Sequence, residues 1–378
     1  MKKKALPLID VYLDNAATSF PKPKRVVDEL YRCVVSYCGN PGRSGHGMSM
    51  YAAEKIYEAR EIISAFFGLS EPEKVCFTQN STSSLNTVIK GLIKNKCHVI
   101  ISDAEHNSVL RPLFRLKSEL NIEISRFDSD KPLRKSVIPL IRKDTGFLIC
   151  NLTSNVTGKE IDLNEIKEIA DKYKLALILD ASQSAGHKKI DLNGIKRGAL
   201  CCAGHKALFG IQGSGFFVLL GDTLPSVVFE GGSGSDSFNK RMPDEPPEKY
   251  EAGTLSCPAI VTLSEGIKFI NSVGIENITD KINRLTSYTL DRLNDLKDIH
   301  IYGANSGIIS FNKEGLSSFE TADMLSERSI AVRGGFHCAP EIHKKLGTEK
   351  RGTVRISYSY LNTFSDADRL IEALKNEK

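Results

Sequence analysis

The sequence predicts an α/β fold with a large, mostly parallel β-sheet and a second, smaller α+β domain. Segments typical of strands and helices alternate from residue 74 to residue 220, which is the pattern of repeated βαβ units. The run from Leu175 to Leu179 is continuously apolar, as strands buried on both faces of a parallel sheet are. The length of 378 residues exceeds one ordinary core, so two domains are expected.

The individual elements follow from apolar periodicity and from turn residues. A short strand is expected to start at Val11, and the further strands of the large sheet cover 74–78, 98–102, 147–152, 175–179 and 199–203. Helices are expected over 24–36, 49–67, 85–93 and 163–173. Towards the C-terminus, helices are expected over 258–273, 275–296 and 321–327 and from residue 366, with strands over 307–311, 330–332 and 353–357. We place the large domain at 15–257 and the small domain at 258–378 together with 1–14.

Composition excludes several classes of protein. Charged residues make up 26% of the chain, the net charge is +5 and tryptophan is absent, so there is no basic, aromatic-rich surface typical of nucleic-acid binding. No apolar run reaches the length of a membrane span, and Pro7 and Asp10 interrupt the only segment that resembles a signal peptide. The nine cysteines are scattered and form no CxxC pair, which favours a reduced, cytoplasmic protein without a metal site.

Polar residues follow the expected strands at the ends where α/β folds place ligands. They are Ser81, Thr82, His106, Asn155, Asp180, Gln183 and Lys206. The hydroxyls of Ser81 and Thr82 at a helix start could bind an anion or simply cap the helix. His106 could stack on a flat ring or be an ordinary surface residue. The glycine-rich loop with Arg43 and His46 could line a site or be a solvated turn.

Asp180 and Lys206 suit pyridoxal 5'-phosphate (PLP). This cofactor needs a lysine that holds it as a Schiff base and an aspartate that keeps its pyridine nitrogen protonated. A buried ion pair, or two unrelated surface charges, would explain the same two residues equally well.

The order and spacing of the motifs resemble the cysteine desulfurases of the class V aminotransferase group, from Tyr12 to the final helix. The motifs are Leu13–Thr18, Asn80–Thr82, Ala104–His106, Ser154–Asn155, Asp180–Gln183, Gly204–Lys206, Glu251–Thr254, Arg333–Cys338, and Arg355 with Tyr360–Thr363. The resemblance implies a PLP-dependent homodimer of fold type I that takes sulfur from L-cysteine and leaves alanine.

The resemblance also implies a role for each matching position. Lys206 would bind the cofactor covalently, Asp180 would pair with the pyridine nitrogen, and Gln183 would bond the ring hydroxyl. His106 would stack on the ring. Ser81, Thr82 and His205 would hold the phosphate, joined by Thr254 of the other subunit. Arg355 and Asn155 would bind the substrate carboxylate, and Arg43 and His46 match residues near the site mouth. Arg333 is also expected among the substrate-binding residues.

Cys338 would be the nucleophile and carry the sulfur as a persulfide. Its thiolate is the reactive form, and we expect Arg333 and His337 to favour that anion. The short segment around Cys338 resembles the subgroup that passes its sulfur to a separate acceptor protein. The pathway that uses the sulfur, such as iron–sulfur cluster assembly, selenium metabolism or nucleoside modification, stays open.

Two positions depart from the family pattern, and three other functions remain open. Ala203 replaces a common phosphate-site serine, a loss on the order of 1 kcal/mol. Asn80 stands where glycine is frequent. The alternatives are a selenocysteine lyase acting on L-selenocysteine, another class V enzyme such as an aminotransferase, and a non-catalytic sulfur carrier.

Overall fold

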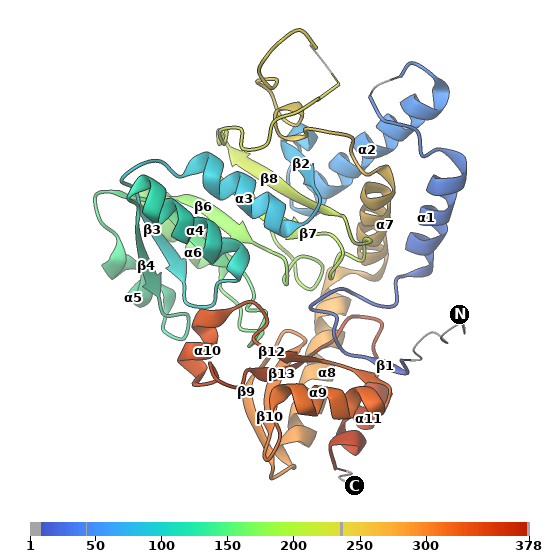
Figure 1. Ribbon diagram of the computed structural model, residues 1–378, viewed down its shortest axis with the longest axis vertical. Coiled ribbons are helices and arrows are strands. Elements are labelled where there is room, and N and C mark those ends of the chain that lie inside the picture. Colours follow the sequence, from blue (N-terminus) through green and yellow to red (C-terminus); the bar gives the residue numbers. More distant parts are fainter. Residues whose placement is uncertain (1–8, 43, 235–236, 376–378) are drawn as a thin grey trace, which may run out of the picture. The chain divides into compact units, whose positions relative to one another are not determined.

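The computed structural model describes residues 9–42, 44–234 and 237–375 of the chain (Figure 1). It divides into two compact units. The larger unit comprises residues 22–153 and 161–276, and the smaller one comprises residues 1–21, 154–160 and 277–378, of which 9–21, 154–160 and 277–375 are described. No helix among the described residues is long and apolar enough to cross a bilayer.

The larger unit is built on a seven-stranded sheet in the order β2-β8-β7-β6-β5-β3-β4. Its strands are β2 (Val75–Thr78), β3 (His98–Ser102), β4 (Glu123–Phe127), β5 (Thr145–Asn151), β6 (Ala176–Asp180), β7 (Arg197–Ala203) and β8 (Gly215–Gly221). Only β8 runs antiparallel to its neighbours β2 and β7. The carboxyl ends of the other six strands therefore lie at the same edge of the sheet.

Helices of the larger unit pack on this sheet and on one another (Figure 1). They are α1 (Lys24–Ser36), α2 (Gly47–Phe66), α3 (Ser81–Leu92), α4 (Asn107–Leu120), α5 (Leu133–Val137), α6 (Leu163–Tyr173) and α7 (Cys257–Val273). Helix α3 packs on α4 and on strands β7 and β8, whereas α7 packs on α1 and α2. Burial of apolar residues between α3, α4 and the sheet forms one hydrophobic cluster that stabilises this unit.

The smaller unit contains a four-stranded antiparallel sheet in the order β12-β13-β10-β9 and a two-stranded parallel pair, β1 with β11. The strands are β1 (Val11–Tyr12), β9 (Ile299–Asn305), β10 (Ile308–Lys313), β11 (Ile330–Ala331), β12 (Arg333–Gly335) and β13 (Thr353–Ser357). The helices are α8 (Ile275–Asn294), α9 (Ser318–Glu327), α10 (Pro340–Leu346) and α11 (Phe364–Lys375).

The observed α/β architecture confirms the expected fold class, while the compact units differ from the expected domain boundaries. Helix α7 clusters with the larger unit, although the expected boundary lay at its start. Residues 154–160 cluster with the smaller unit, where the backbone carbonyls of Val156 and Thr157 accept hydrogen bonds from Ser310 of β10 and Asn305 of β9. The segment through Pro21, and not only residues 1–14, belongs to the smaller unit.

Candidate active site

The carboxyl edge of the large sheet gathers most of the residues expected to bind the cofactor. Ser81 and Thr82 follow β2, His106 follows β3, Asp180 ends β6, and Lys206 follows β7. Strands β6 and β7 are parallel neighbours in register, with Asp180 opposite Cys201. The turn that carries Lys206 therefore begins beside the strand end that carries Asp180.

The turn after β2 is a helix start with several hydroxyl groups. Asn80 is the N-cap of α3, because its Oδ1 accepts a hydrogen bond from the Ser83 backbone nitrogen at 2.9 Å. Helix α3 thus begins at Ser81, four residues earlier than the expected Leu85. Ser81 and Thr82 lie in its first turn, where backbone N–H groups are unpaired within the helix and an anion is favoured.

His106 is both the N-cap of α4 and part of this hydroxyl cluster. Its Nδ1 accepts the Ser108 backbone N–H at 3.1 Å, so a neutral His106 ring carries its proton on Nε2. Ser108 Oγ lies 2.9 Å from the same Nδ1 and 2.8 Å from Thr82 Oγ1. Ser108 therefore connects the expected ring-stacking residue to the expected phosphate turn.

Asp180 is buried and keeps one oxygen available. Its Oδ1 accepts hydrogen bonds from the Ser182 backbone nitrogen at 2.9 Å and from Ser182 Oγ at 2.5 Å. Ser182 Oγ also lies 2.7 Å from Ser81 Oγ, which links β6 to the phosphate turn. No described residue hydrogen-bonds to Asp180 Oδ2. A carboxylate oxygen of a buried residue that no described group bonds suits a charged N–H of a ligand.

The lysine motif lies in a turn with a neutral imidazole and a second cation. Burial, together with Lys206 and Lys22, lowers the pKa of His205 to about 4, so its ring is neutral at pH 7. Lys22 Nζ donates to the His205 carbonyl oxygen at 2.9 Å, and burial lowers the pKa of Lys22 to about 8. Lys22 adds positive charge beside Lys206, which favours an anionic ligand.

These features fit PLP. The free Asp180 oxygen suits a pyridinium N–H, the start of α3 suits a phosphate, and Lys206 supplies the amine. Gln183 is buried in the turn after Asp180.

Two expected site residues, His46 and Thr254, have no hydrogen bond within the described part of the chain to the cofactor residues above, and a third, Arg43, is not described. His46 is the exposed N-cap of α2, and its Nδ1 accepts the Ser49 N–H at 3.2 Å, which is a capping role. Thr254 is exposed and lines a pocket of about 280 Å³, and no hydrogen bond among the described residues joins it to the other cofactor residues. Arg43 lies outside the described residues.

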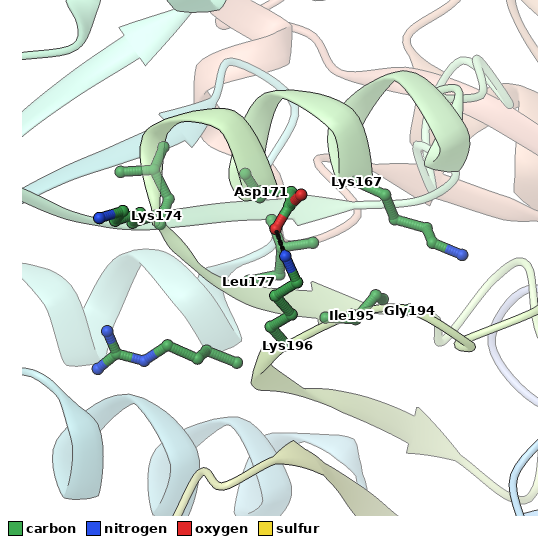
Figure 2. A pocket seen from close by; sticks show the side chains of 10 residues that line it. Lys167, Asp171, Lys174, Leu177, Gly194, Ile195 and Lys196 are labelled. Atoms are coloured by element: carbon green, nitrogen blue, oxygen red, sulfur yellow. Dashed lines mark ion pairs between the residues drawn. The ribbon is translucent and has the colours of Figure 1, made fainter.

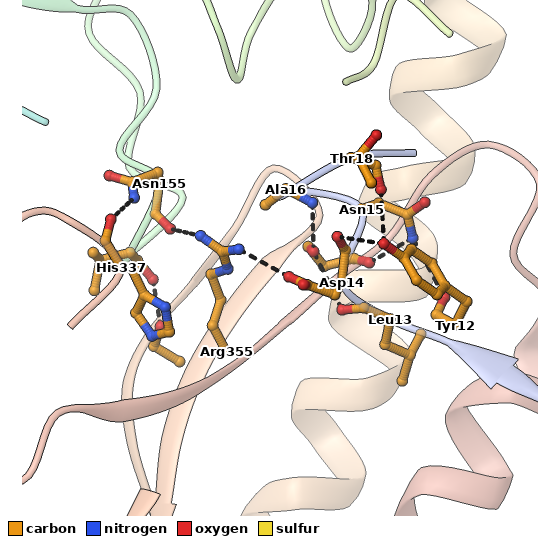
Figure 3. A network of polar contacts seen from close by, with 12 residues as sticks. Tyr12, Leu13, Asp14, Asn15, Ala16, Thr18, Asn155, His337 and Arg355 are labelled. Carbon is orange, nitrogen blue, oxygen red and sulfur yellow. Dashed lines mark hydrogen bonds and ion pairs between the residues drawn. The ribbon is translucent and has the colours of Figure 1, made fainter. Parts of the chain in front are cut away.

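The residues expected to bind substrate form a connected cluster in the smaller unit (Figure 3). Arg355 is 1% exposed; its Nη1 donates to the Asn155 carbonyl oxygen and its Nη2 to Asp14 Oδ1, both at 3.0 Å. Asn155 Nδ2 donates to the His337 carbonyl oxygen at 2.7 Å. Arg355 Nε and Asn155 Oδ1 are buried without a partner among the described residues, so the cluster has polar atoms that a ligand could satisfy.

Cys338 is exposed, and the two residues at 337 and 338 both have a positive φ, 48° and 56°. His337 is buried, and its Nε2 lies 3.0 Å from the Thr353 carbonyl oxygen. Burial, with Arg355, holds the pKa of His337 well below its usual value, so the ring is neutral at pH 7. The expectation that His337 supports a Cys338 thiolate by positive charge is therefore wrong, and of the two residues only Arg333 carries that charge.

A separate pocket of about 350 Å³ lies between α6 and the amino ends of β6 and β7 (Figure 2). Lys196, one of the lining residues, pairs with Asp171 at 2.5 Å (Figure 2). It is at the opposite edge of the sheet from Asp180 and is not part of the candidate site.

Sequence reasoning missed the residues that position others. Ser108 stands two positions after His106, and Ser182 lies inside the recognised motif Asp180–Gln183, where it was given no role. Asp14 lies inside a motif that was recognised, but without a role. No sequence signal marked Lys22, because its contact with His205 spans 183 residues of chain.

The fold and the site define a PLP-dependent α/β enzyme, and comparisons with known proteins agree. The family model "Aminotransferase class-V" matches residues 11–370. A "Probable cysteine desulfurase" of Methanothermobacter thermautotrophicus is 30% identical, over 99% of this chain and 96% of that protein.

Solved structures show the same relationship. The apo structure of the cysteine desulfurase from Thermococcus onnurineus NA1 has a TM-score of 0.87 and 29% identity, covering 99% of this chain and 98% of that one. A C-DES variant with glycine covalently linked to its PLP cofactor shares the fold, with a TM-score of 0.83 and 17% identity over 96% of both chains. This chain belongs to the class V aminotransferase family, and within it to the cysteine desulfurases.

Proposed function

We propose that this protein removes sulfur from L-cysteine, leaving L-alanine, and holds the sulfur as a persulfide on Cys338. One observation carries the proposal. Within the smaller unit, Asn155 connects a buried arginine to the backbone next to an exposed cysteine, through Arg355 Nη1 on one side and the His337 carbonyl on the other. A class V aminotransferase has no need for such a cysteine, whereas a desulfurase does.

The residues of the chain divide the chemistry between them. PLP, when bound, supplies an electron sink for the substrate carbon. Lys206 holds the cofactor and then moves the substrate Cα proton, and Asp180 Oδ2 holds the proton of the pyridine nitrogen. His106 would pack on the cofactor ring. Gln183 would bond the ring hydroxyl, while Ser81, Thr82 and His205 would hold the phosphate.

The smaller unit supplies the substrate and sulfur groups. Arg355 binds the substrate carboxylate with its planar guanidinium, assisted by Asn155, with Arg333 adding positive charge. The Cys338 thiolate attacks the substrate sulfur. A sulfur–sulfur bond forms as the carbon–sulfur bond breaks, and the carbon keeps the electron pair and is protonated to give alanine.

We further propose a cytoplasmic homodimer that passes its persulfide to an acceptor protein. The scattered, unpaired cysteines support a reducing compartment. The exposure of Cys338 supports transfer to a partner. The exposure of Thr254 supports the proposal that it completes the phosphate site of a second subunit. Arg43 and His46 would belong to the mouth of the active site.

The test measures alanine and sulfide release from L-cysteine with a reductant, in wild type and in the Lys206→Ala, Cys338→Ala and Cys38→Ala variants. We expect equal amounts of both products in wild type and in Cys38→Ala, because Cys38 is the other exposed cysteine and has no role. Both activities should disappear in the other two variants, with bound cofactor retained in Cys338→Ala. Competition with L-selenocysteine would identify a selenium-specific lyase, and turnover by Cys338→Ala would indicate another class V reaction.

A further inference from the structure

Arg355, the proposed carboxylate-binding residue, already holds a carboxylate of its own chain. Its Nη2 donates to Asp14 Oδ1 at 3.0 Å, and the Arg355 side chain is 1% exposed while that of Asp14 is 20% exposed. The other acceptor, on Nη1, is a backbone carbonyl. Of the two groups that cover the guanidinium, the Asp14 carboxylate is therefore the one that can move without a backbone change.

The backbone around Asp14 is fixed, so only its side chain is free to rotate. Leu13 accepts a hydrogen bond from the Ser357 backbone nitrogen at 2.7 Å. Asn15 Nδ2 donates to the Ser357 carbonyl oxygen at 2.9 Å, and the Ala16 backbone nitrogen donates to Ser357 Oγ at 2.8 Å (Figure 3). The residues on both sides of Asp14 are thus bonded to Ser357, which lies two positions after Arg355.

The side chains around Arg355 carry one more positive charge than negative charge, so one further anion can be neutralised there. Arg333 and Arg355 are directly opposite on the antiparallel strands β12 and β13, so they share one face of the sheet. Of these two arginines, only Arg355 pairs with a carboxylate among the described residues, that of Asp14. The neighbouring Tyr12 is no acid at neutral pH, because burial and Asp14 raise its pKa to about 12. A ligand carboxylate would neutralise the remaining positive charge.

We propose that the Asp14 carboxylate pairs with the Arg355 guanidinium when substrate is absent, and that the substrate carboxylate displaces it on binding. Asp14 would then set substrate affinity by competition, since the apparent dissociation constant rises as the open fraction falls. It would also keep Arg355 from being a buried, unpaired charge between turnovers. This inference rests on the proposed function for Arg355 as the carboxylate-binding residue.

The test compares Asp14→Asn, Asp14→Ser and the control Asp10→Asn as holoenzymes. Asp10 pairs with Arg369 at 2.8 Å in the same N-terminal segment, but both side chains are exposed. For the Asp14 variants we expect the KM for L-cysteine to fall about tenfold, equivalent to about 1.4 kcal/mol, with kcat changed less than about twofold. Asp10→Asn should behave as wild type. An unchanged or raised KM in both Asp14 variants would overturn the proposal, the latter indicating that Asp14 only positions Arg355.

A second readout does not depend on catalysis. We expect propionate to raise the melting temperature of the Asp14 variants more than that of wild type and Asp10→Asn, and propionamide, its neutral analogue, to act equally on all four proteins. Equal shifts by propionate in all four would overturn the proposal. If wild type released no alanine from L-cysteine but the propionate difference was present, the proposed function would fail while the role of Asp14 as a competing carboxylate would stand.

Discussion

Glu105 is a fully buried carboxyl group next to the expected ring-stacking residue. Its Oε1 accepts hydrogen bonds from Ser102 Oγ at 2.5 Å and from the Asn151 backbone nitrogen at 3.0 Å, so it joins the ends of β3 and β5. Its Oε2 has no partner among the described residues. Burial raises the pKa of Glu105 to about 8, and the charge of Asp180 adds to this effect.

This raised pKa predicts a pH dependence of stability. The folded protein holds a proton on Glu105 that the unfolded chain releases near pH 4.5, so the stabilisation is complete below that pH and is lost as the pH rises to about 8. Over this window the free energy of unfolding should fall by up to about 1.4 kcal/mol per pH unit from this group. Urea unfolding from pH 5 to 8 should show the loss in wild type and a flatter profile in Glu105→Gln. The same pH dependence of unfolding in wild type and Glu105→Gln would contradict the raised pKa of Glu105.

The cysteines predict a second residue-scale result. Cys338 and Cys38 are exposed, whereas Cys76, Cys150, Cys201 and Cys202 are buried. Burial also raises the pKa of those four thiols well above its usual value, which keeps them unreactive.

Brief treatment of the native protein with iodoacetamide at pH 8 should therefore alkylate Cys338 and Cys38 first. Peptide mass spectrometry should find one of these two labels missing in each of Cys338→Ala and Cys38→Ala. In the wild-type protein, all nine cysteines should be labelled only after denaturation. Early labelling of Cys201 or Cys202 in the folded protein would show that the strand β7 opens.

At the scale of single residues, the sequence predicted identities better than partners. Asp180 and Lys206 could be chosen because a strand end is a predictable place. The neutral state of His337 could not, because it depends on burial in the folded chain and on the charge of Arg355, which the sequence does not place beside it. The same holds for the pairing of Arg355 with Asp14, which joins positions 341 residues apart.

At the scale of elements, one buried ion pair holds the segment that ends at Thr254. Arg60 of α2 donates two hydrogen bonds to Glu251, at 2.8 Å to Oε1 and 2.6 Å to Oε2. Glu251 also accepts the Phe77 backbone nitrogen of β2 at 2.7 Å. The pair therefore joins α2, β2 and the approach to α7.

Glu251→Gln should destabilise the protein by about 3–5 kcal/mol, because it leaves the Arg60 charge buried and unpaired. The exposed pair Arg115–Glu119 provides the control, since Glu119→Gln should cost less than about 1 kcal/mol. Both values would come from urea unfolding at pH 7. Equal effects of the two substitutions would show that burial of the Arg60 pair adds nothing.

Some elements were predicted to the residue and others were missed, for physical reasons. The helix over 24–36, the strand over 98–102 and the helix over 163–173 have strong apolar periodicity and match α1, β3 and α6. Strand β8 was not expected, because its pairing with β2 and β7 is a tertiary effect. Gly215 permits this pairing, since a Cβ there would lie 2.5 Å from the Asn80 backbone.

At the scale of the whole molecule, each unit contains its own set of expected site residues. The larger unit has the expected cofactor residues at one sheet edge, and the smaller unit has Arg355 on strand β13, with Asn155 bonded to it and Cys338 in the turn after β12. Thr254 is the exception, since it is exposed and no hydrogen bond among the described residues joins it to the other expected cofactor residues. A second copy of the chain is our proposed reason for its position.

Mixing two inactive variants tests this directly. If Thr254 serves the opposite site, a dimer of one Lys206→Ala chain and one Thr254→Ala chain contains one site with both native residues and one with neither. Random exchange of subunits should then restore about a quarter of wild-type activity, because half of the dimers are mixed and each has one intact site. If Thr254 acted within its own chain, no site in the mixture would be intact, and activity would not exceed that of Thr254→Ala alone.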